Sequence, residues 1–395
     1  MAKGLLYSVR RGLQSVLTGL LQGGPWFRLW LHMKSRKLGR LYQKSLLQSA
    51  SQRVDNETRS PAVVPARELL RRLLFICDSS WERQELLPEL KRICEVTFID
   101  VHGYVKARGS ADEELDTPKF LSELAKESHT RFDAILVYLR ASLLSEELLG
   151  HLKKTWHCPV FGYNLDCKTT FEPYSVFRAA PANYRRWAKA FECNLTSARA
   201  MLDIYAGAGL RVLYVPPAYH YDPAVHKVRS DMGFEIGLSF LGSWKPEREE
   251  FIEKLARAGV AVEMFGRGWK NQTYVEHVWP IYQRSQLNLG LGYNLPSLRT
   301  TNLKNRDFEC PGAGGCYLTT YDWELAGLVE VGKEILCYRS VDDLIELYSY
   351  YIRRPEECLR IATAGFERCV REHTWEQRFR RVFEQLGFQL GPRSK

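Results

Sequence analysis

Residues 71–101, RRLLFICDSSWERQELLPELKRICEVTFIDV, decide the fold class of this 395-residue chain. An apolar run over 73–77 ends in small polar residues, the next stretch has the spacing of an amphipathic helix, and a second apolar run starts at residue 94. This order is typical of a β-α-β unit. The sequence therefore predicts a parallel sheet with helices on both faces.

The same pattern continues along the chain and restarts near Asp231. Strand-like runs occupy 132–139, 158–165, 190–197 and 210–217, and then 235–243, 260–266, 287–293 and 316–321. A chain of this length is too long for one typical core. We expect an α/β protein with two Rossmann-like domains, 69–230 and 231–370, facing a cleft in which ligands bind, and a last helix and tail over 371–395 that cross back.

The positive charge of the chain is concentrated at its amino-terminal end. The formal net charge is +10, and residues 1–54 hold ten Lys and Arg residues and no acid, so the remaining residues sum to zero. An electroneutral body argues against nucleic acid as a partner. The ten cysteines show no CxxC pair, and several lie in apolar runs, which favours a reducing compartment.

Residues 1–54 are predicted to form a basic amphipathic helical segment. Leu and Val side chains from Leu5 to Leu21 fall on one side of a helix, a Gly23-Gly24-Pro25 break follows, and WFRLW precedes a basic cluster. The uncharged stretch is too short and too polar to span a bilayer. We expect a segment that lies on an anionic membrane, peripheral on the inner, cytoplasmic face of the cell membrane, joined by a linker over 55–68. A helical arm packed on the protein or a second subunit, or an organellar presequence, remains an alternative.

The most informative stretch for chemistry is 301–320, TNLKNRDFECPGAGGCYLTT. Lys304 and Arg306 can clamp phosphoryl oxygens, and Glu309 can accept two hydroxyl hydrogen bonds, as a ribose offers. Gly314 and Gly315 follow in a turn that can approach an anion, since free amides at a helix start attract negative charge. These residues predict a nucleoside diphosphate site, although solvated cations and a glycine helix cap would use the same residue types.

A second cluster, FLGSWKPERE, lies at the end of a predicted strand. Gly242 and Ser243 allow a close backbone approach, and Lys245 and Arg248 lead into the next helix. At the carboxyl end of a strand these cations would face the cleft. Plain surface charge is the alternative. The chain contains no Asp-x-Asp pair or phosphate-binding loop motif, so we expect any phosphate to be held without a metal or other cofactor.

The ordered series RDFE, PGAGG, LTTY, EVGKEI, YRSVDDL and REHTW resembles the carboxyl-terminal domain of CgeB-like (spore-coat maturation type) glycosyltransferases, which are similar to the group 1 GT-B enzymes. The resemblance covers about 70–385 and is strongest from 236 onward. It implies a GT-B fold and transfer of a sugar from a nucleotide sugar to an acceptor hydroxyl. The basic segment 1–54 suggests a glycan or lipid-linked acceptor of the membrane or cell envelope.

The resemblance also implies roles for single residues. Glu309 matches the acid that holds the nucleotide ribose, whereas the earlier acid of the family's paired pattern is replaced by Thr301. Diphosphate contacts are implied for a set of glycine and basic positions, and a nucleobase contact for one loop. The first set is Gly242, Lys245, Arg248, Lys304 and Arg306, and the loop contains Gly266, Gly268 and Trp269.

The amino-terminal half should then bind the acceptor and supply any general base. The candidates are Asp78, Ser79, His102, Asp166, His220 and Asp222. We predict Asp166 and His102 as the catalytic residues. A buried histidine or a turn-capping aspartate is the alternative for each candidate. For the whole chain, a nucleotide-sugar epimerase and a non-catalytic assembly protein with the same fold stay open as alternatives.

Overall fold

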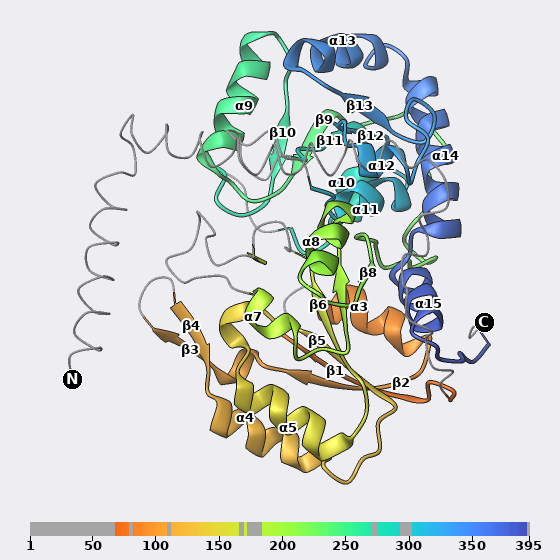
Figure 1. Cartoon of the computed structure of the whole chain (residues 1–395). Coiled ribbons are helices and arrows are strands. Elements are labelled where there is room, and N and C mark those ends of the chain that lie inside the picture. The colour runs from red at the N-terminus through yellow and green to blue at the C-terminus, as the bar shows by residue number, and fades with distance from the viewer. Residues whose placement is uncertain are drawn as a thin grey trace.

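The computed structural model describes residues 68–78, 82–108, 112–165, 170–171, 184–270, 275–292 and 302–392. Two α/β domains lie one above the other (Figure 1). The predicted segment 1–54, residues 55–67 of the predicted linker 55–68, Ser79, Asp166 and Thr301 fall outside the described residues. In the part that is described, no helix is both long and apolar enough to cross a membrane.

The amino-terminal domain is built on a six-stranded parallel sheet of order β2-β1-β5-β6-β7-β8. Its strands are β1 (Arg72–Cys77), β2 (Glu95–Asp100), β5 (Ala134–Tyr138), β6 (Val160–Asn164), β7 (Cys193–Thr196) and β8 (Val212–Tyr214). Its helices are α3 (Glu82–Lys91), α4 (Thr117–Leu124), α5 (Glu146–Trp156), α7 (Tyr184–Ala188) and α8 (Leu202–Gly207). An antiparallel hairpin of β3 (Val105–Arg108) and β4 (Asp112–Leu115), which the sequence analysis did not predict, is inserted after β2.

The carboxyl-terminal domain repeats this plan with a five-stranded parallel sheet of order β10-β9-β11-β12-β13. Its strands are β9 (Ile236–Leu241), β10 (Glu263–Phe265), β11 (Ser285–Leu289), β12 (Tyr317–Thr320) and β13 (Leu336–Tyr338). Its helices are α9 (Pro246–Arg257), α10 (Trp279–Arg284), α11 (Arg306–Gly312), α12 (Trp323–Ala326), α13 (Val341–Tyr351) and α14 (Pro355–Glu372). In both sheets the strand order reverses beside the first strand, between β1 and β5 and between β9 and β11, which is the switch point where such folds bind ligands.

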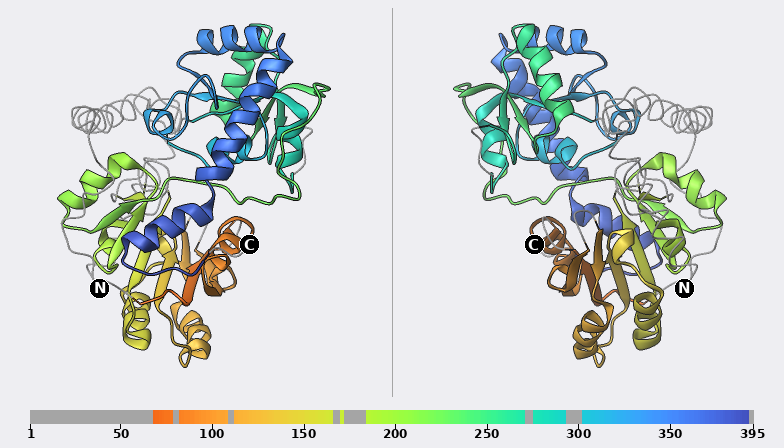
Figure 2. Two further views of the ribbon diagram at one scale, coloured as in Figure 1. Left: turned by 90° about the vertical axis from the view of Figure 1, so that its right-hand side faces the viewer. Right: turned by 90° about the vertical axis from the view of Figure 1, so that its left-hand side faces the viewer.

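The last helix, α15 (Trp375–Gln385), leaves the carboxyl-terminal domain and packs on the amino-terminal one (Figure 2). Thr374 starts it with a capping box to Gln377, which explains why the long apolar pattern of the tail breaks here into two helices. The crossing lies beside the outgoing linker, the segment 215–235 that joins β8 to β9. Trp375 N–H fixes it there by donating to Tyr219 O at 3.1 Å. The chain therefore passes twice between the domains at one place.

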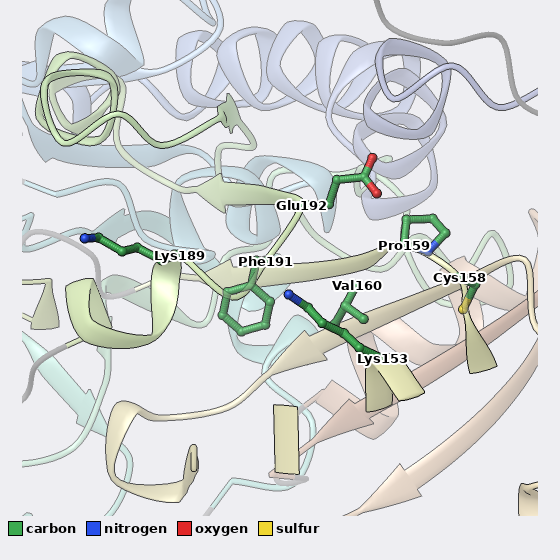
Figure 3. A pocket seen from close by; sticks show the side chains of 7 residues that line it. All are labelled: Lys153, Cys158, Pro159, Val160, Lys189, Phe191 and Glu192. Carbon is green, nitrogen blue, oxygen red and sulfur yellow. The ribbon is translucent and has the colours of Figure 1, made fainter. Parts of the chain in front are cut away.

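A hollow of about 440 Å³ lies at the amino-terminal edge of the first sheet (Figure 3). It is lined by Val160 at the start of β6 and by Lys153, Lys189 and Glu192. Glu192 also lies 3.8 Å from the guanidinium of Arg211. This edge is opposite to the carboxyl-terminal strand ends at which ligands of Rossmann-like domains bind.

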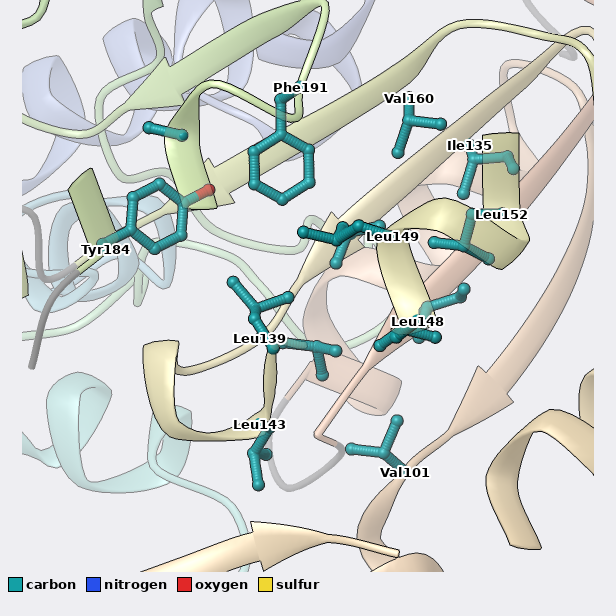
Figure 4. Close-up of a cluster of buried hydrophobic side chains, with 14 of the residues drawn as sticks. Val101, Ile135, Leu139, Leu143, Leu148, Leu149, Leu152, Val160, Tyr184 and Phe191 are labelled. Carbon is teal, nitrogen blue, oxygen red and sulfur yellow. The ribbon is translucent and has the colours of Figure 1, made fainter. Parts of the chain in front are cut away.

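Each face of the amino-terminal sheet has its own core. One face is covered by α4 and α5, where Leu148 and Leu152 pack near Ile135 and Val160 (Figure 4). The other face is covered by α3 and α15, whose aromatic side chains include the fully buried Phe383. Each large apolar side chain that is buried in this way contributes about 1.5–3 kcal/mol.

The carboxyl-terminal edges of the two sheets meet at the domain boundary. Glu324 follows β12, and its carboxylate accepts hydrogen bonds from the backbone N–H of Arg199 at 2.8 Å and from the hydroxyl of Tyr214 at 3.3 Å. Arg199 follows β7 and Tyr214 ends β8. Loops that leave the carboxyl ends of strands in one domain therefore face those of the other.

Beside the crossing, Glu89 of α3 joins three segments. Its carboxylate has no exposed surface, lies 2.8 Å from His220 Nδ1 and accepts from the backbone N–H of Glu376 at 2.9 Å. Arg92 forms an ion pair with it. One buried acid thus holds α3, the outgoing linker and the start of α15 together.

Candidate functional site

The loops after β9 and β10 are joined into one surface by backbone hydrogen bonds. Gly242 N–H donates to Phe265 O at 2.9 Å, and Trp244 N–H donates to Arg267 O at 2.7 Å. Gly266 has a φ of +125°, and a Cβ there would lie 2.5 Å from Gly242 O. Glycine is therefore required at this position, because the two loops approach to backbone contact.

Two arginines from different helices converge on this surface. The guanidinium carbons of Arg248 on α9 and Arg306 at the start of α11 lie 5.6 and 5.4 Å from the centre of the Phe240 ring. A Cβ built on Gly242 would lie 2.8 Å from Arg306 Nη1 and 3.1 Å from Arg248 Nη1. The sequence places these residues far apart, and the fold brings them to the switch point between β9 and β11.

The two guanidinium groups are held by backbone oxygens. Arg248 Nη1 donates to Ser243 O at 2.6 Å, and Arg306 Nη1 donates to Leu241 O. Nε of Arg306 is buried and has no hydrogen-bond partner among the described residues. Burial and the nearby Arg306 lower the pKa of Arg248 to about 10. Two largely buried cations that repel each other, one with an unused donor, form a site that fits an anion.

Glu309 lies one turn further along α11. The hydroxyl of Tyr282 donates to Glu309 Oε2 at 3.0 Å, and burial raises the pKa of this carboxyl. Its neighbour across the domain boundary is Glu85 of α3, whose pKa is raised to about 8 by burial and then by the charge of Glu309. Glu85 Oε2 accepts from the backbone N–H of His220 at 2.9 Å. Glu309, the acid predicted to hold a ribose, thus faces the other domain. Because two carboxylates lie close together, a state in which Glu85 and Glu309 together carry one proton is favoured.

The other predicted cations lie nearby on the same edge. Lys245 is exposed at the amino-terminal end of α9, where its carbonyl accepts from Arg248 N–H at 3.0 Å. Ser243 is exposed beside it. Lys304 precedes α11, and its backbone N–H donates to the buried carboxylate of Asp307 at 2.7 Å. The start of α9 and the start of α11 therefore both carry a lysine next to the converging arginines.

Trp269 supports the Gly242 loop from the core side, and its predicted place near the nucleobase stays a prediction. Its side chain is 6 % exposed and packs edge-on against Phe240. Its indole N–H donates to Gly242 O at 2.7 Å. The indole therefore holds the Gly242 loop from the core side and presents little surface to a ligand.

Gly314 and Gly315 lie in a closely packed turn, and their predicted role in donor binding stays a prediction. They lie after the carboxyl-terminal end of α11, while Arg306 lies at its start. Gly314 has a φ of +88°, and a Cβ there would lie 2.2 Å from Lys227 O. A Cβ on Gly315 would lie 2.8 Å from Cys310 Sγ. Close packing against the interdomain linker explains Gly314, and close packing against Cys310, Asn288 and Tyr282 explains Gly315.

The acceptor-side predictions fall into two groups. His102 lies 3.6 Å from Asp78, measured from Nδ1 to Oδ1, at the carboxyl-terminal edge of the first sheet. His220 and Asp222 have structural places, because His220 is bound to Glu89, and Asp222 Oδ1 accepts from Ala224 N–H at 2.9 Å in a turn. Asp166, the other predicted catalytic residue, stays a prediction outside the described residues.

A family model described as glycosyl transferase-like matches residues 247–384, which include α9, α11 and the crossing into α15. A comparison with curated protein sequences finds no match. The matched region contains Arg248, Arg306 and Glu309.

Solved structures of similar fold cover most of the chain. HepE from Anabaena, in complex with UDP and glucose, has a TM-score of 0.53 at 12 % identity, over 80 % of this chain and 99 % of its own. Sucrose-phosphate synthase from Thermosynechococcus elongatus has a TM-score of 0.52 at 11 % identity, over 80 % and 99 %. An alpha-glucosyltransferase in complex with UDP has a TM-score of 0.51 at 13 % identity, over 80 % and 99 %.

These likenesses confirm the predicted fold class. The superpositions cover 80 % of this chain and 99 % of HepE and of sucrose-phosphate synthase, so the likeness extends over both domains. The chain has the GT-B fold, with a glycosyl transferase-like region in its carboxyl-terminal half.

Proposed function

We propose that the protein is a glycosyltransferase that moves a sugar from a nucleoside-diphosphate sugar to an acceptor hydroxyl. The observation that carries the proposal is the convergence of Arg248 and Arg306 on Gly242 at the switch point of the second sheet. The solved structures of similar fold that hold UDP support it. Guanidinium pairs suit phosphate groups because each presents a planar fork of donors.

The arrangement has a clear chemical use. When the bond between a sugar and a diphosphate breaks, negative charge develops on the leaving oxygens. Fixed cations and backbone amides stabilise that charge most strongly where water is excluded. In this proposal Arg248 and Arg306 hold the diphosphate, Lys245 and Lys304 add positive charge at its rim, and Glu309 accepts hydrogen bonds from the ribose. We propose that the two guanidinium groups stabilise the charge on the leaving diphosphate without a metal ion.

Calorimetry with UDP tests the donor site. We expect UDP to bind the full-length protein and Arg248→Ala to weaken binding about 10–100-fold, since hydrogen bonds to charged groups contribute about 1.5–3 kcal/mol. The matched control is Arg257→Ala at the other end of α9, whose side chain is 71 % exposed. Equal UDP affinity in wild type and in the Arg248 variant would refute the proposed site. Addition of EDTA to the wild-type protein should leave its UDP affinity unchanged.

Product analysis separates transfer from the related activities of the fold. A panel of UDP-, GDP- and ADP-sugars is incubated with and without acceptors, and the products are separated by chromatography. Release of nucleoside diphosphate that increases with acceptor supports transfer. Conversion of one nucleotide sugar into another without an acceptor would instead show an epimerase, and binding of UDP with no turnover would show a non-catalytic protein.

We propose further that the acceptor lies at a membrane or cell envelope, as a glycan or lipid-linked hydroxyl. The support is the sequence of residues 1–54, with ten cations, no acid and an amphipathic pattern. On this basis we propose a peripheral position on the cytoplasmic face of the membrane. Flotation with vesicles of phosphatidylglycerol and phosphatidylcholine tests this. Full-length protein should float with the anionic vesicles, and a chain that starts at Leu69 should not.

A further inference from the structure

The switch point of the amino-terminal sheet carries a charged group of its own. Asp78 directly follows β1, and Arg140 follows β5 two residues after its end. The Arg140 guanidinium is hydrogen-bonded to Asp78 Oδ2 and, through its other terminal nitrogen, to Glu113 of the hairpin. The ion pair therefore bridges the two neighbouring strands between which the strand order reverses.

The imidazole of His102 stands beside this pair. His102 follows β2, the strand on the other side of β1, and its backbone N–H donates to Asp100 Oδ1 at 2.9 Å. Its Nδ1 lies 3.6 Å from Asp78 Oδ1, just beyond hydrogen-bond distance, and its side chain is 77 % exposed. With Nδ1 turned to a carboxylate, Nε2 is the ring nitrogen left to take a proton. Catalytic hydrogen bonds of this kind are often long before substrate binds.

This group lies on the edge that meets the donor site. The loop after β1 leads into α3, where Glu85 interacts with Glu309 of α11. Arg306 begins that same helix α11. The first strand of each sheet thus ends near the domain boundary, with an arginine pair on the nucleotide side and a carboxylate, an imidazole and an arginine on the other side.

We propose that His102 is the proton acceptor for the acceptor hydroxyl, that Asp78 orients its ring, and that Arg140 is a positioning residue that fixes Asp78. This inference rests on the proposed function. In the step, the hydroxyl proton moves to His102 Nε2 while the hydroxyl oxygen bonds to the anomeric carbon. The bond from that carbon to the diphosphate oxygen breaks, and its electron pair stays on the diphosphate, which Arg248 and Arg306 neutralise.

Arg140 has a defined part in this arrangement. The Arg140 guanidinium fixes the Asp78 carboxylate beside the imidazole, and a carboxylate that faces Nδ1 favours the tautomer with the proton on Nδ1. Glu113 holds the second arm of the same guanidinium, so the hairpin fixes the direction of the Arg140 side chain. Loss of Arg140 should therefore act through Asp78 and His102, without contact to the substrate.

The test compares turnover with nucleotide binding in the same variants. Nucleoside diphosphate release from the sugar-nucleotide panel is measured with water and with methyl glycosides of glucose, galactose, mannose and N-acetylglucosamine as acceptors. UDP affinity is measured in parallel by calorimetry. The variants are His102→Gln, Asp78→Asn, Arg140→Met and Arg140→Lys. The control is Glu95→Gln, which breaks the 2.9 Å ion pair with Arg72 at the opposite edge of the same sheet.

We expect His102→Gln and Asp78→Asn to lower kcat about 100-fold to 10,000-fold, the range for loss of a general base, with UDP affinity unchanged. The fall of kcat on the acidic side of the pH profile should disappear in His102→Gln. Arg140→Lys should recover part of the activity lost in Arg140→Met, and Glu95→Gln should match wild type. His102→Gln carries the test because its exposed side chain is not needed for folding.

Two results would overturn the assignment. The first is a wild-type kcat and pH profile in His102→Gln. The second is bound UDP with no release from any donor, because a proton acceptor requires a reaction. Failure of wild-type protein to bind UDP would remove the proposed function itself, and this inference with it, so the calorimetry distinguishes the two failures.

Discussion

Glu324 on α12 accepts a hydrogen bond of 2.8 Å from the backbone N–H of Arg199, and so links the carboxyl-terminal end of β12 to that of β7. The carboxylate is buried, and it also accepts from the hydroxyl of Tyr214, whose pKa is raised by burial and by the charge of Glu324. A single side chain of one domain thus satisfies two donors of the other. The contact sets the distance between the nucleotide side and the acceptor side.

Replacement of Glu324 by alanine should destabilise the protein. The Arg199 N–H and the Tyr214 hydroxyl would lose their acceptor in a buried place, at a cost of about 1–3 kcal/mol for each unsatisfied group. Urea denaturation followed by tryptophan fluorescence measures the change. Glu346→Ala, at an exposed position on α13, is the control and should stay within about 0.5 kcal/mol of wild type. An equal effect of both substitutions would contradict the interdomain role of Glu324.

Gly266→Ala should damage the donor site. The Cβ would lie 2.5 Å from Gly242 O, and the φ of +125° is strained for alanine, so the loop after β9 must shift. We expect a loss of UDP affinity together with a lower free energy of unfolding. Gly150→Ala in α5 is the matched control, since nothing lies within 4 Å of its Cβ, and alanine should stabilise that helix by about 0.5–1 kcal/mol. Full UDP affinity in Gly266→Ala would show that the loop contact is unimportant.

Arg306→Lys should bind UDP more weakly than wild type although the charge is kept. The guanidinium reaches Leu241 O and still has its buried Nε available, whereas an ammonium group offers one point of contact. A loss of about tenfold, measured by calorimetry, is expected for one missing charge-assisted hydrogen bond. The control is Lys254→Arg on α9, which replaces lysine by arginine in an exposed ion pair. It should leave the UDP affinity unchanged. Unaltered affinity in Arg306→Lys would mean that net charge alone holds the anion.

Glu85 predicts a pH dependence of stability with a defined sign. Burial and Glu309 raise the pKa of Glu85 to about 8, so the folded state keeps a proton that the unfolded chain loses near its ordinary value. The contribution is favourable at low pH, and the free energy of unfolding falls as pH rises from about 4.5 to about 8, by up to about 1.4 kcal/mol per pH unit. Glu89, Glu309 and His220 face the same carboxyl.

Glu85→Gln replaces the titrating carboxyl by an amide. It should flatten the dependence of the free energy of unfolding on pH. Urea denaturation at pH 5, 6, 7 and 8 should show the variant gaining stability over wild type as pH rises. Glu95→Gln, an exposed acid at the other sheet edge, reports the effect of removing a surface charge. Parallel profiles for wild type and Glu85→Gln would contradict a proton on the carboxyl pair.

The local pattern of apolar residues was enough to predict the alternation of strands and helices, because each strand is a continuous run that can be read without knowledge of long-range contacts. The family resemblance implied diphosphate contacts for both Arg248 and Arg306, although they stand 58 positions apart. It could not show that both lie on Phe240, since this depends on how α11 packs beside β9. The hairpin of β3 and β4 was missed because its strands are short and polar.

Contacts between distant segments give several predicted site residues surroundings that the sequence did not indicate. Gly314 lies against the backbone of Lys227 in the interdomain linker, and Gly315 lies against Cys310 and Asn288. Trp269 looks accessible in a glycine-rich loop, and only the tertiary packing shows that it is buried. The pair of Asp78 and Arg140 joins residues 62 positions apart, so no local motif predicts it.

The position of α15 has a consequence for synthesis of the chain. Its buried side chains Trp375, Phe379 and Phe383 belong to the same core as α3, and Leu70 N–H donates to Gln389 O at 2.9 Å. A ribosome delivers the first sheet more than 150 residues before this covering helix. Until then only α3 of the two covering helices packs on that face of the sheet, so the domain that emerges first is completed last, and the apolar surface left exposed in the nascent chain favours aggregation or chaperone binding.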